Sequence, residues 1–350
     1  MTARHVLASS LLIATVSLAL MAQGQPPAPA TQPAKAAGGP VKPLMTLKGA
    51  GVYDQDDMCF WRDPKDASKS LIITSDKYAN KVFVYDLEGK LLQTLDAPFP
   101  GNIDTRYGFP LGGEKVDIVV HNQRQNKNFK LRVYKVDPQK RQLVRIDNEN
   151  INTGDNYGGT LYHSGKTGKF YFFTTSKKST VEQHELFDDG KGKVAGKHVR
   201  SMRAGFSEGA VADDAAGTVF VASERHGIIA FQAEPDAPKE GKMIATAKQY
   251  GIRPDLEGMT IFPTSDTDGY LIASSQGNNT FKVFDRKPPY AYVGTFTVAG
   301  VTETDGIDCI AGDFGPRFPK GIFICHTGAD RKICPNMLVS WTDVLKALGR

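Results

Sequence analysis

Short apolar segments of strand length recur along this chain with a regular period. The clearest repeat spans residues 254–285, where PDLEGMTIF, YLIASSQGNN and TFKVFD follow one another across polar turns. Matching positions at the start of the first run in each repeat are about 48 to 51 residues apart. They are Asp57, Tyr107, Tyr157, Glu208, Glu257 and Asp305. A period in this range is typical of propeller blades, because each blade is one small sheet that packs against the next.

Six repeats of about four strands each predict an all-β fold, a six-bladed β-propeller. The last repeat is one strand short. Residues 44–52 (LMTLKGAGV) have the character of the missing strand and lie at the other end of the repeat array. We therefore expect N- and C-terminal strands to pair and close the ring, since an open blade would leave an unpaired edge.

The first residues have the pattern of an exported protein. Residues 1–24 combine a basic start, an apolar run at 6–20 and small residues near the end, which is typical of a signal peptide. The run is short for a membrane span. Residues 25–43 are rich in Pro and Ala and predict a disordered linker, which leaves residues 44–350 for the propeller. We expect a secreted or periplasmic monomer without a membrane span.

The net charge and the cysteine content limit the possible binding partners and the cellular compartment. The net charge of +5 is not gathered into a basic helix or tail, so we expect no nucleic-acid partner. Four cysteines fit an oxidising compartment. Cys325 and Cys334 are close in sequence and could form a disulfide. Cys59 and Cys309 fall in expected first strands, where buried free thiols are the simpler interpretation.

Polar residues collect where the first strand of a blade begins and where the second ends. Because consecutive antiparallel strands reverse direction, these two positions share one mouth of the propeller. First-strand starts contribute Asp56, Asp57, Asp104, Tyr157, Glu208, Asp255, Glu257 and Asp305. Second-strand ends contribute Lys77, Arg124, Lys177, Glu224 and Gln276. The cations come from the first three repeats and most of the acids from the last three, so one side of the mouth is basic and the other acidic.

This arrangement favours a metal site beside a phosphate site. Carboxylates about 4 Å apart repel by roughly 4 kcal/mol at an effective dielectric near 20, so cations are expected among them. Oxygen ligands with few nearby His and no Cys pairs favour several Ca²⁺ ions over Zn²⁺ or Mg²⁺. Lys and Arg bind phosphate oxygens. Bridged ions could lower the pKa of a shared water and stabilise in-line phosphoryl transfer.

Several motifs at these positions resemble those of the β-propeller phytases, secreted calcium-dependent phosphomonoesterases that act on inositol hexakisphosphate. The resemblance covers residues 51–341. It rests on DDMCFWRDP (56–64), NIDTRY (102–107), LYHS (161–164), EQHEL (182–186), SEG (207–209), DLEG (255–258), SSQGN (274–278) and TDGID (304–308).

The resemblance implies a 3-phytase-like phosphoric monoester hydrolase, with phytate or other inositol phosphates as substrate. It implies a calcium-centred cleavage site made of Asp57, Tyr157, Glu208, Glu224, Asp255, Glu257, Gln276 and Asp305. Among these we predict Glu208, Glu224, Glu257, Asp255 and Tyr157 to be catalytic. Lys77, Arg124 and Lys177 would bind substrate phosphates, and Asp56 and Asp104 would hold neighbouring calcium ions.

Two other functions fit part of the pattern. A metal-dependent lactonase would explain the acids, because some six-bladed propellers hold a metal in the channel, but it would not explain Lys77, Arg124 and Lys177. A non-catalytic propeller that binds a protein or an anionic ligand would explain both charges. No covalent nucleophile with a positioned base stands out in the sequence, which favours direct attack by a calcium-activated water.

Overall fold

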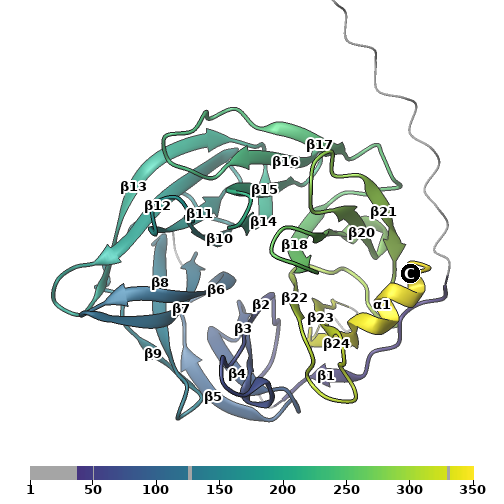
Figure 1. Cartoon of the computed structure of the whole chain (residues 1–350), viewed down its shortest axis with the longest axis horizontal. Coiled ribbons are helices and arrows are strands. Elements are labelled where there is room, and N and C mark those ends of the chain that lie inside the picture. The colour runs from purple at the N-terminus through teal and green to yellow at the C-terminus, as the bar shows by residue number, and fades with distance from the viewer. Residues whose placement is uncertain (1–37, 50, 125–127, 329–331) are drawn as a thin grey trace, which may run out of the picture. The chain divides into compact units, whose positions relative to one another are not determined.

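Six antiparallel sheets of four strands each form a ring in the computed structural model, which describes residues 38–49, 51–124, 128–328 and 332–350 (Figure 1). The predicted six-bladed β-propeller is therefore confirmed. Within the described part of the chain the one α-helix is α1 (Trp341–Ala347), and no helix there is long and apolar enough to cross a membrane. The predicted signal peptide and residues 25–37 of the predicted linker lie outside the described residues.

Each of the first five blades is built from four consecutive strands. Blade one contains β2 (Asp57–Trp61), β3 (Leu71–Asp76), β4 (Lys81–Asp86) and β5 (Leu91–Asp96). Blade two contains β6 (Pro100–Leu111), β7 (Glu114–Gln123), β8 (Lys130–Asp137) and β9 (Gln142–Arg145). Blade three contains β10 (Gly158–His163), β11 (Phe170–Thr175), β12 (Thr180–Asp188) and β13 (Val194–Arg203). Blade four contains β14 (Ser207–Asp213), β15 (Thr218–Ser223), β16 (Gly227–Gln232) and β17 (Lys242–Thr246). Blade five contains β18 (Leu256–Pro263), β19 (Gly269–Ser275), β20 (Thr280–Asp285) and β21 (Tyr292–Phe296).

The sixth blade joins the two ends of the propeller. It contains β22 (Ile307–Ala311), β23 (Gly321–His326), β24 (Asn336–Ser340) and, at its outer edge, β1 (Met45–Leu47). β1 pairs antiparallel with β24, with Met45 opposite Leu338, so the expected closure by residues 44–52 is confirmed. Val41, just before β1, bridges to Val298. The chain is therefore held at the last two blades before the first blade begins.

Apolar side chains fill the spaces between neighbouring blades. Trp61 is fully buried and its indole Nε1 donates to Asp117 of blade two at 2.9 Å, so it belongs to the core. Between the last two blades, the Trp341 ring stacks on Phe262 with 3.8 Å between centroids. Contacts of this kind lie between neighbouring sheets around the ring, so each blade is stabilised by the blades on both sides of it.

The strand that closes the ring offers a matched pair of leucines. Leu47 is 1% exposed, whereas Leu44, immediately before β1, is 43% exposed. We expect Leu47→Ala to lower the free energy of unfolding by about 2–5 kcal/mol, because it opens a cavity at the closure. Leu44→Ala should change it by less than about 0.5 kcal/mol. Denaturant titrations of both variants check this, and equal stabilities would mean that β1 contributes little to closure.

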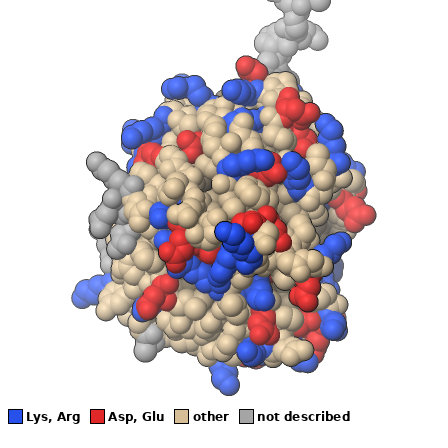
Figure 2. Space-filling view, turned by 90° about the vertical axis from the view of Figure 1, so that its left-hand side faces the viewer, with Lys and Arg blue, Asp and Glu red and all other residues tan. Residues whose placement is uncertain are grey.

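The outer surface mixes both signs of charge. On the side of the ring that lies at the left of Figure 1, Lys and Arg are interspersed with Asp and Glu (Figure 2). This outer face therefore shows no separation of the two signs of charge.

Candidate active site

The residues predicted at the rim surround one mouth of the ring, where innermost strands begin and their neighbours end. Asp57 starts β2, Glu208 and Glu257 are the second residues of β14 and β18, and Tyr157 and Asp255 directly precede β10 and β18. Lys77, Arg124, Glu224 and Gln276 directly follow β3, β7, β15 and β19, and Lys177 lies two residues beyond β11. Asp305 lies two residues before β22.

Glycines after the acidic residues bring the innermost strands close together. A β-carbon at Gly209 would lie 1.5 Å from the backbone oxygen of Glu257, and one at Gly306 would lie 2.2 Å from Asp57 Oδ1. Side chains other than hydrogen do not fit there, so the acid–glycine pairs allow neighbouring blades to approach. The carboxylates that precede these glycines are crowded as a consequence.

Three glutamates form the acidic side of the mouth. Carboxylate oxygens of Glu208, Glu224 and Glu257 all lie within 4.8 Å of one another. The three residues are 8%, 4% and 6% exposed. Glu224 Oε1 and Glu257 Oε2 are buried and have no hydrogen-bond partner among the described residues. Unpaired buried oxygens carry a desolvation cost, so this cluster is suited to bind a cation.

Burial and mutual repulsion make these carboxyl groups hard to ionise. Burial raises the pKa of Glu208 to about 7, although Arg124 is beside it. Burial, with Asp255 and Glu208 next in importance, raises the pKa of Glu224 to about 8. The pKa of Glu257 is raised well above its usual range by burial and by the other two glutamates. Near neutral pH the site therefore favours protons or metal over three bare charges.

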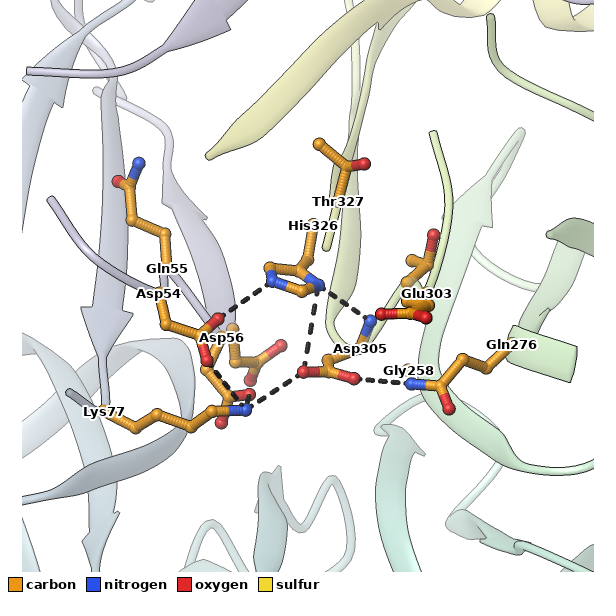
Figure 3. Close-up of polar contacts among 12 residues, drawn as sticks. Asp54, Gln55, Asp56, Lys77, Gly258, Gln276, Glu303, Asp305, His326 and Thr327 are labelled. Carbon is orange, nitrogen blue, oxygen red and sulfur yellow. Dashed lines mark hydrogen bonds and ion pairs between the residues drawn. The ribbon is translucent and has the colours of Figure 1, made fainter. Parts of the chain in front are cut away.

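A row of alternating charges crosses the rest of the mouth. Lys77 Nζ lies 3.1 Å from Asp54 Oδ2, 2.6 Å from Asp56 Oδ1 and 3.1 Å from Asp305 Oδ2 (Figure 3). Arg124 continues the row, with 2.7 Å to Asp56 and 3.0 Å to Glu208. Burial alone would raise the pKa of Asp56, but Lys77 and Arg124 pull it well below its usual range. Two of the three predicted phosphate-binding cations are thus paired with carboxylates.

The ring of Tyr157 contacts two cationic side chains, Arg124 and Lys177. The Arg124 guanidinium is 5.2 Å from its ring centroid and Lys177 Nζ is 4.0 Å from it, so both cations contact the π system. Burial, together with the charges of Glu208 and Glu257, raises the pKa of the Tyr157 hydroxyl. The hydroxyl therefore stays protonated and can donate a hydrogen bond. Lys177 is exposed, unlike Lys77 and Arg124.

The other predicted ligands lie at different depths. Gln276 Nε2 donates to Asp305 Oδ1 at 2.7 Å, which places both at the mouth. Asp255 lies 3.8 Å from Arg225. Asp57 accepts from the backbone N–H of Ile103 at 2.9 Å, and burial raises its pKa well above the usual range. Gln276, Asp305, Asp255 and Asp57 therefore lie around the three glutamates, but each has its own contacts and they do not all meet at one point.

Blade two departs from the expected register. β6 begins at Pro100, and Tyr107 lies seven residues further on, where its hydroxyl accepts from the Arg62 backbone N–H. Tyr107 is therefore not at the matching first-strand position. That place belongs to Asn102, which is 6% exposed and lies beside Asp57, Glu208 and Glu257 around a small internal space. In NIDTRY, polar Asn102 and Asp104 alternate with apolar Ile103. This pattern is the sequence signal that could have identified Asn102 as the first-strand position of blade two.

Asp104 lies two residues further along β6 than Asn102 and lines a different pocket, together with Arg106 and Asp214. Its carboxylate accepts from Thr160 and Leu161, each at 2.8 Å, and pairs with Arg106 at 3.0 Å. It is not part of the groups of potential ligand atoms found among the described residues. Its expected role as a calcium ligand stays a prediction.

The expected Cys325–Cys334 disulfide is wrong. All four cysteines are free thiols, and Cys59 and Cys309 are buried as expected. Cys325 lies in β23 within the apolar core, and the next residue, His326, contacts Cys334 on the opposite face. Because successive residues of a strand point to opposite faces, Cys334 faces away from Cys325.

A pH-dependent stability follows from the glutamates. In metal-free protein, Glu208 and Glu224 have pKa values of about 7 and about 8, against about 4.3 in an unfolded chain. Between these values the folded state binds more protons, so stability should fall as pH rises from about 5 to 8. Melting curves in chelator at several pH values test this. The slope should be shallower in Glu224→Gln, and a melting temperature that rises with pH would contradict it.

The donor atoms at the mouth fit a hard divalent cation. Glu208, Glu224 and Glu257 offer only carboxylate oxygens, and two of these oxygens are buried without a partner among the described residues. Oxygen-only sets of this kind suit Ca²⁺ or Mg²⁺ better than thiophilic metals. A metal at the acidic side of the mouth is therefore chemically reasonable.

Comparisons with known proteins agree with this geometry. The family model described as Phytase matches residues 9–349. A curated relative, 3-phytase from Bacillus subtilis (strain 168), is 38% identical over 310 residues, which cover 84% of this chain and 81% of the relative. The match to the family model extends across all six blades and across the charged residues of the mouth. The chain belongs to the phytase family.

Proposed function

We propose that this protein hydrolyses phosphate monoesters of myo-inositol hexakisphosphate and depends on Ca²⁺. The observation that carries the proposal is the buried cluster of Glu208, Glu224 and Glu257 beside Lys77, Arg124 and Lys177 at one mouth of the ring. A polyanionic substrate needs the cations, and the acids would repel it unless metal neutralised them. The family match and the 3-phytase relative support the same reaction.

The three glutamates, with Asp255, Asp305 and Gln276 around them, would hold the metal. When bound, calcium neutralises phosphate charge and lowers the pKa of an attacking water. The protein itself fixes these oxygens in place. The glycine that follows each acid lets the innermost strands of neighbouring blades lie close together. Ca²⁺ suits this irregular oxygen cluster better than Mg²⁺, which demands a near-octahedral shell.

The basic residues would position the substrate. Lys177 is exposed at the mouth and is held over the Tyr157 ring, so its ammonium group can contact phosphate oxygens directly. Lys77 and Arg124 donate to carboxylates that are themselves candidate metal ligands. A metal held by those carboxylates would compete for their oxygens and would leave the N–H donors of Lys77 and Arg124 to phosphate. Substrate binding and metal binding are thereby coupled.

Water is the nucleophile that best fits the site. The raised pKa of Tyr157 keeps its hydroxyl protonated, so it can donate a hydrogen bond to a phosphate oxygen but is poorly suited to attack. Glu208, which contacts both Arg124 and the Tyr157 hydroxyl, would hold these two donors in position.

The experiment that tests this function is phosphate release from inositol hexakisphosphate by purified protein, with Ca²⁺ and with chelator. Release that requires Ca²⁺ is expected. Binding of inositol phosphates without release would favour the non-catalytic propeller, and metal-dependent opening of lactones without phosphate release would favour the lactonase. Full activity in chelator would reject the calcium dependence.

A further inference from the structure

Besides the three glutamates, the described residues offer two more groups of potential metal ligands. One, made of Asp54, Asp56 and Asp305, again has only oxygens, and the other shares Asp54 with it but has a different chemistry. Ligand atoms of Asp54, His326 and Cys334 lie within 4.8 Å of one another, so the group combines oxygen, nitrogen and sulfur. The three residues are 6%, 2% and 9% exposed. His326 Nε2 is 2.9 Å from Asp54 Oδ1, and the Cys334 thiol also contacts the imidazole. Figure 3 shows the His326 ring between Asp54 and Asp305.

The backbone fixes this group before any ligand arrives. Cys334 N donates to Tyr53 O at 2.8 Å, and Gln55 N donates to Cys334 O at 2.9 Å, so Asp54 and Cys334 lie side by side. His326, the last residue of β23, is tied by its N–H to Gly306 O at 3.0 Å. Three segments far apart in the sequence are therefore held in one arrangement, and a rigid ligand set of this kind lowers the cost of binding.

The surroundings of the ring complete a metal-binding histidine. His326 Nδ1 accepts from the Asp305 N–H at 3.1 Å and lies 3.8 Å from Asp305 Oδ2. With a metal on Nε2, the ring proton moves to Nδ1 and faces the Asp305 carboxylate. Asp305 Oδ2, at 3.8 Å, would have to turn toward Nδ1 to accept this proton, which would give the carboxylate–histidine–metal arrangement seen at many metal sites.

Sulfur and nitrogen donors select a different ion from the neighbouring glutamates. Thiolate and imidazole favour Zn²⁺ and related borderline ions, which take four ligands in a tetrahedron, over Ca²⁺. Three protein ligands leave one position. A cavity of about 640 Å³, lined by Asp54, His326 and Cys334 and also by Gln276 and Asp305, provides space for water or a phosphate oxygen there.

We propose that Asp54, His326 and Cys334 form a site for a thiophilic divalent cation of the Zn²⁺ class, separate from the calcium cluster. Binding forms a metal–sulfur bond at Cys334, and the thiol proton passes to solvent. Asp54 Oδ1 faces this site, while Oδ2 keeps its 3.1 Å contact with Lys77. The bound ion fastens the segment before blade one to blade six, where the ring closes.

The test uses the full-length protein, reduced and saturated with Ca²⁺ so that the oxygen cluster is occupied. Added Co²⁺ should give the absorption of a thiolate–cobalt bond, and one equivalent of Zn²⁺ should remove it whereas more Ca²⁺ should not. A 100-fold excess of Zn²⁺ over its Kd should raise the melting temperature by about 4 °C. An unchanged melting temperature, or a band displaced by Ca²⁺, would overturn the proposal.

Variants separate this site from other thiols and from the glutamates. Cys334→Ser should lose the cobalt–thiolate band and the Zn²⁺ stabilisation, and His326→Gln should weaken Co²⁺ binding at least about tenfold. Cys309→Ser is the matched control, because it removes a buried thiol of blade six that lies 3.3 Å from the Thr260 hydroxyl and is not part of the proposed ligand group. It should behave as wild type. Equal Zn²⁺ stabilisation in wild type and Cys334→Ser would assign the effect elsewhere and reject the site, whatever the outcome of the phytate assay.

Discussion

Glu257→Gln should reduce phytate hydrolysis by about 100-fold or more and, at the same time, raise the melting temperature of the chelated protein. The substitution keeps the shape of the side chain and removes one charge from three crowded, buried carboxylates. The lost charge weakens metal binding and with it the electrostatic stabilisation of the reaction. Without metal, the pKa of Glu257 is raised by burial and by the other two glutamates, so folding must either protonate this carboxyl or hold a repelled charge, and Gln removes that cost. Opposite effects on activity and on metal-free stability are the signature of a site that is destabilising without its ion.

Two comparisons make this result specific. Glu208→Gln should also lose most activity and need more Ca²⁺, but should gain less stability in chelator, since Glu208 pairs with Arg124 at 3.0 Å. Glu114→Gln changes an exposed glutamate at the start of β7 and should leave both properties unchanged. Wild-type turnover in both Glu257→Gln and Glu208→Gln would reject the calcium mechanism and favour a propeller that only binds anions.

Arg124→Ala should lower kcat/KM for phytate by about 10- to 100-fold and should also lower the melting temperature in chelator. Its side chain is 8% exposed and pairs with both Asp56 and Glu208. A lost charge-assisted contact costs about 1.5–3 kcal/mol, and each 1.4 kcal/mol is tenfold. Removing the guanidinium also leaves the buried Glu208 carboxyl without its cation and Asp56 with Lys77 alone, and a buried charge that has lost its partner is strongly destabilising.

Lys177→Ala is the matched control for the effect of Arg124→Ala on stability. Lys177 is exposed and contacts the Tyr157 and Phe206 rings rather than a carboxylate. Its loss should raise KM for phytate and leave the melting temperature in chelator almost unchanged. Steady-state kinetics and melting curves of both variants decide the matter. If Arg124→Ala were as stable as wild type in chelator, the row of alternating charges would not contribute to folding.

The blade count and the closure of the ring could be predicted because both follow from strand periodicity. The last repeat lacks one strand, and residues 44–52 have the pattern of an additional strand. Pairing of the two completes the sixth blade, and β1 pairs with β24 as this predicts. The rim residues could be predicted for the same reason, since antiparallel connection fixes which strand ends share a mouth. Neither inference needed the orientation of a side chain.

Blade two shows where periodicity fails. β6 is 12 residues long and its register with β7 shifts twice, between Pro100 and Ile103 and between Arg106 and Phe109. A counting rule places Tyr107 with Asp57 and Glu208, but the irregularities move that position to Asn102. Spacing between repeats does not report such bulges, because they change the length of a strand without changing the number of strands.

Pairings between charged side chains were also beyond the sequence. Lys77 was predicted to face substrate, yet it lies among Asp54, Asp56 and Asp305, and the last of these is 228 residues away. His326 and Asp54 are 272 residues apart, so no local motif links them to Cys334. Such contacts depend on how the ends of the chain meet, and only the closed ring brings them together.

Closure of the ring by β1 also sets when the protein can first work during its synthesis. Blade one leaves the ribosome early, but Asp54 and Asp56 must wait for Asp305 and His326, and β1 must wait for β24. N-terminal blades can form sheets as they emerge. A chain whose sixth blade has not yet been made nevertheless lacks one wall of the acidic mouth. The enzyme therefore becomes competent only once β24 has been made and has paired with β1.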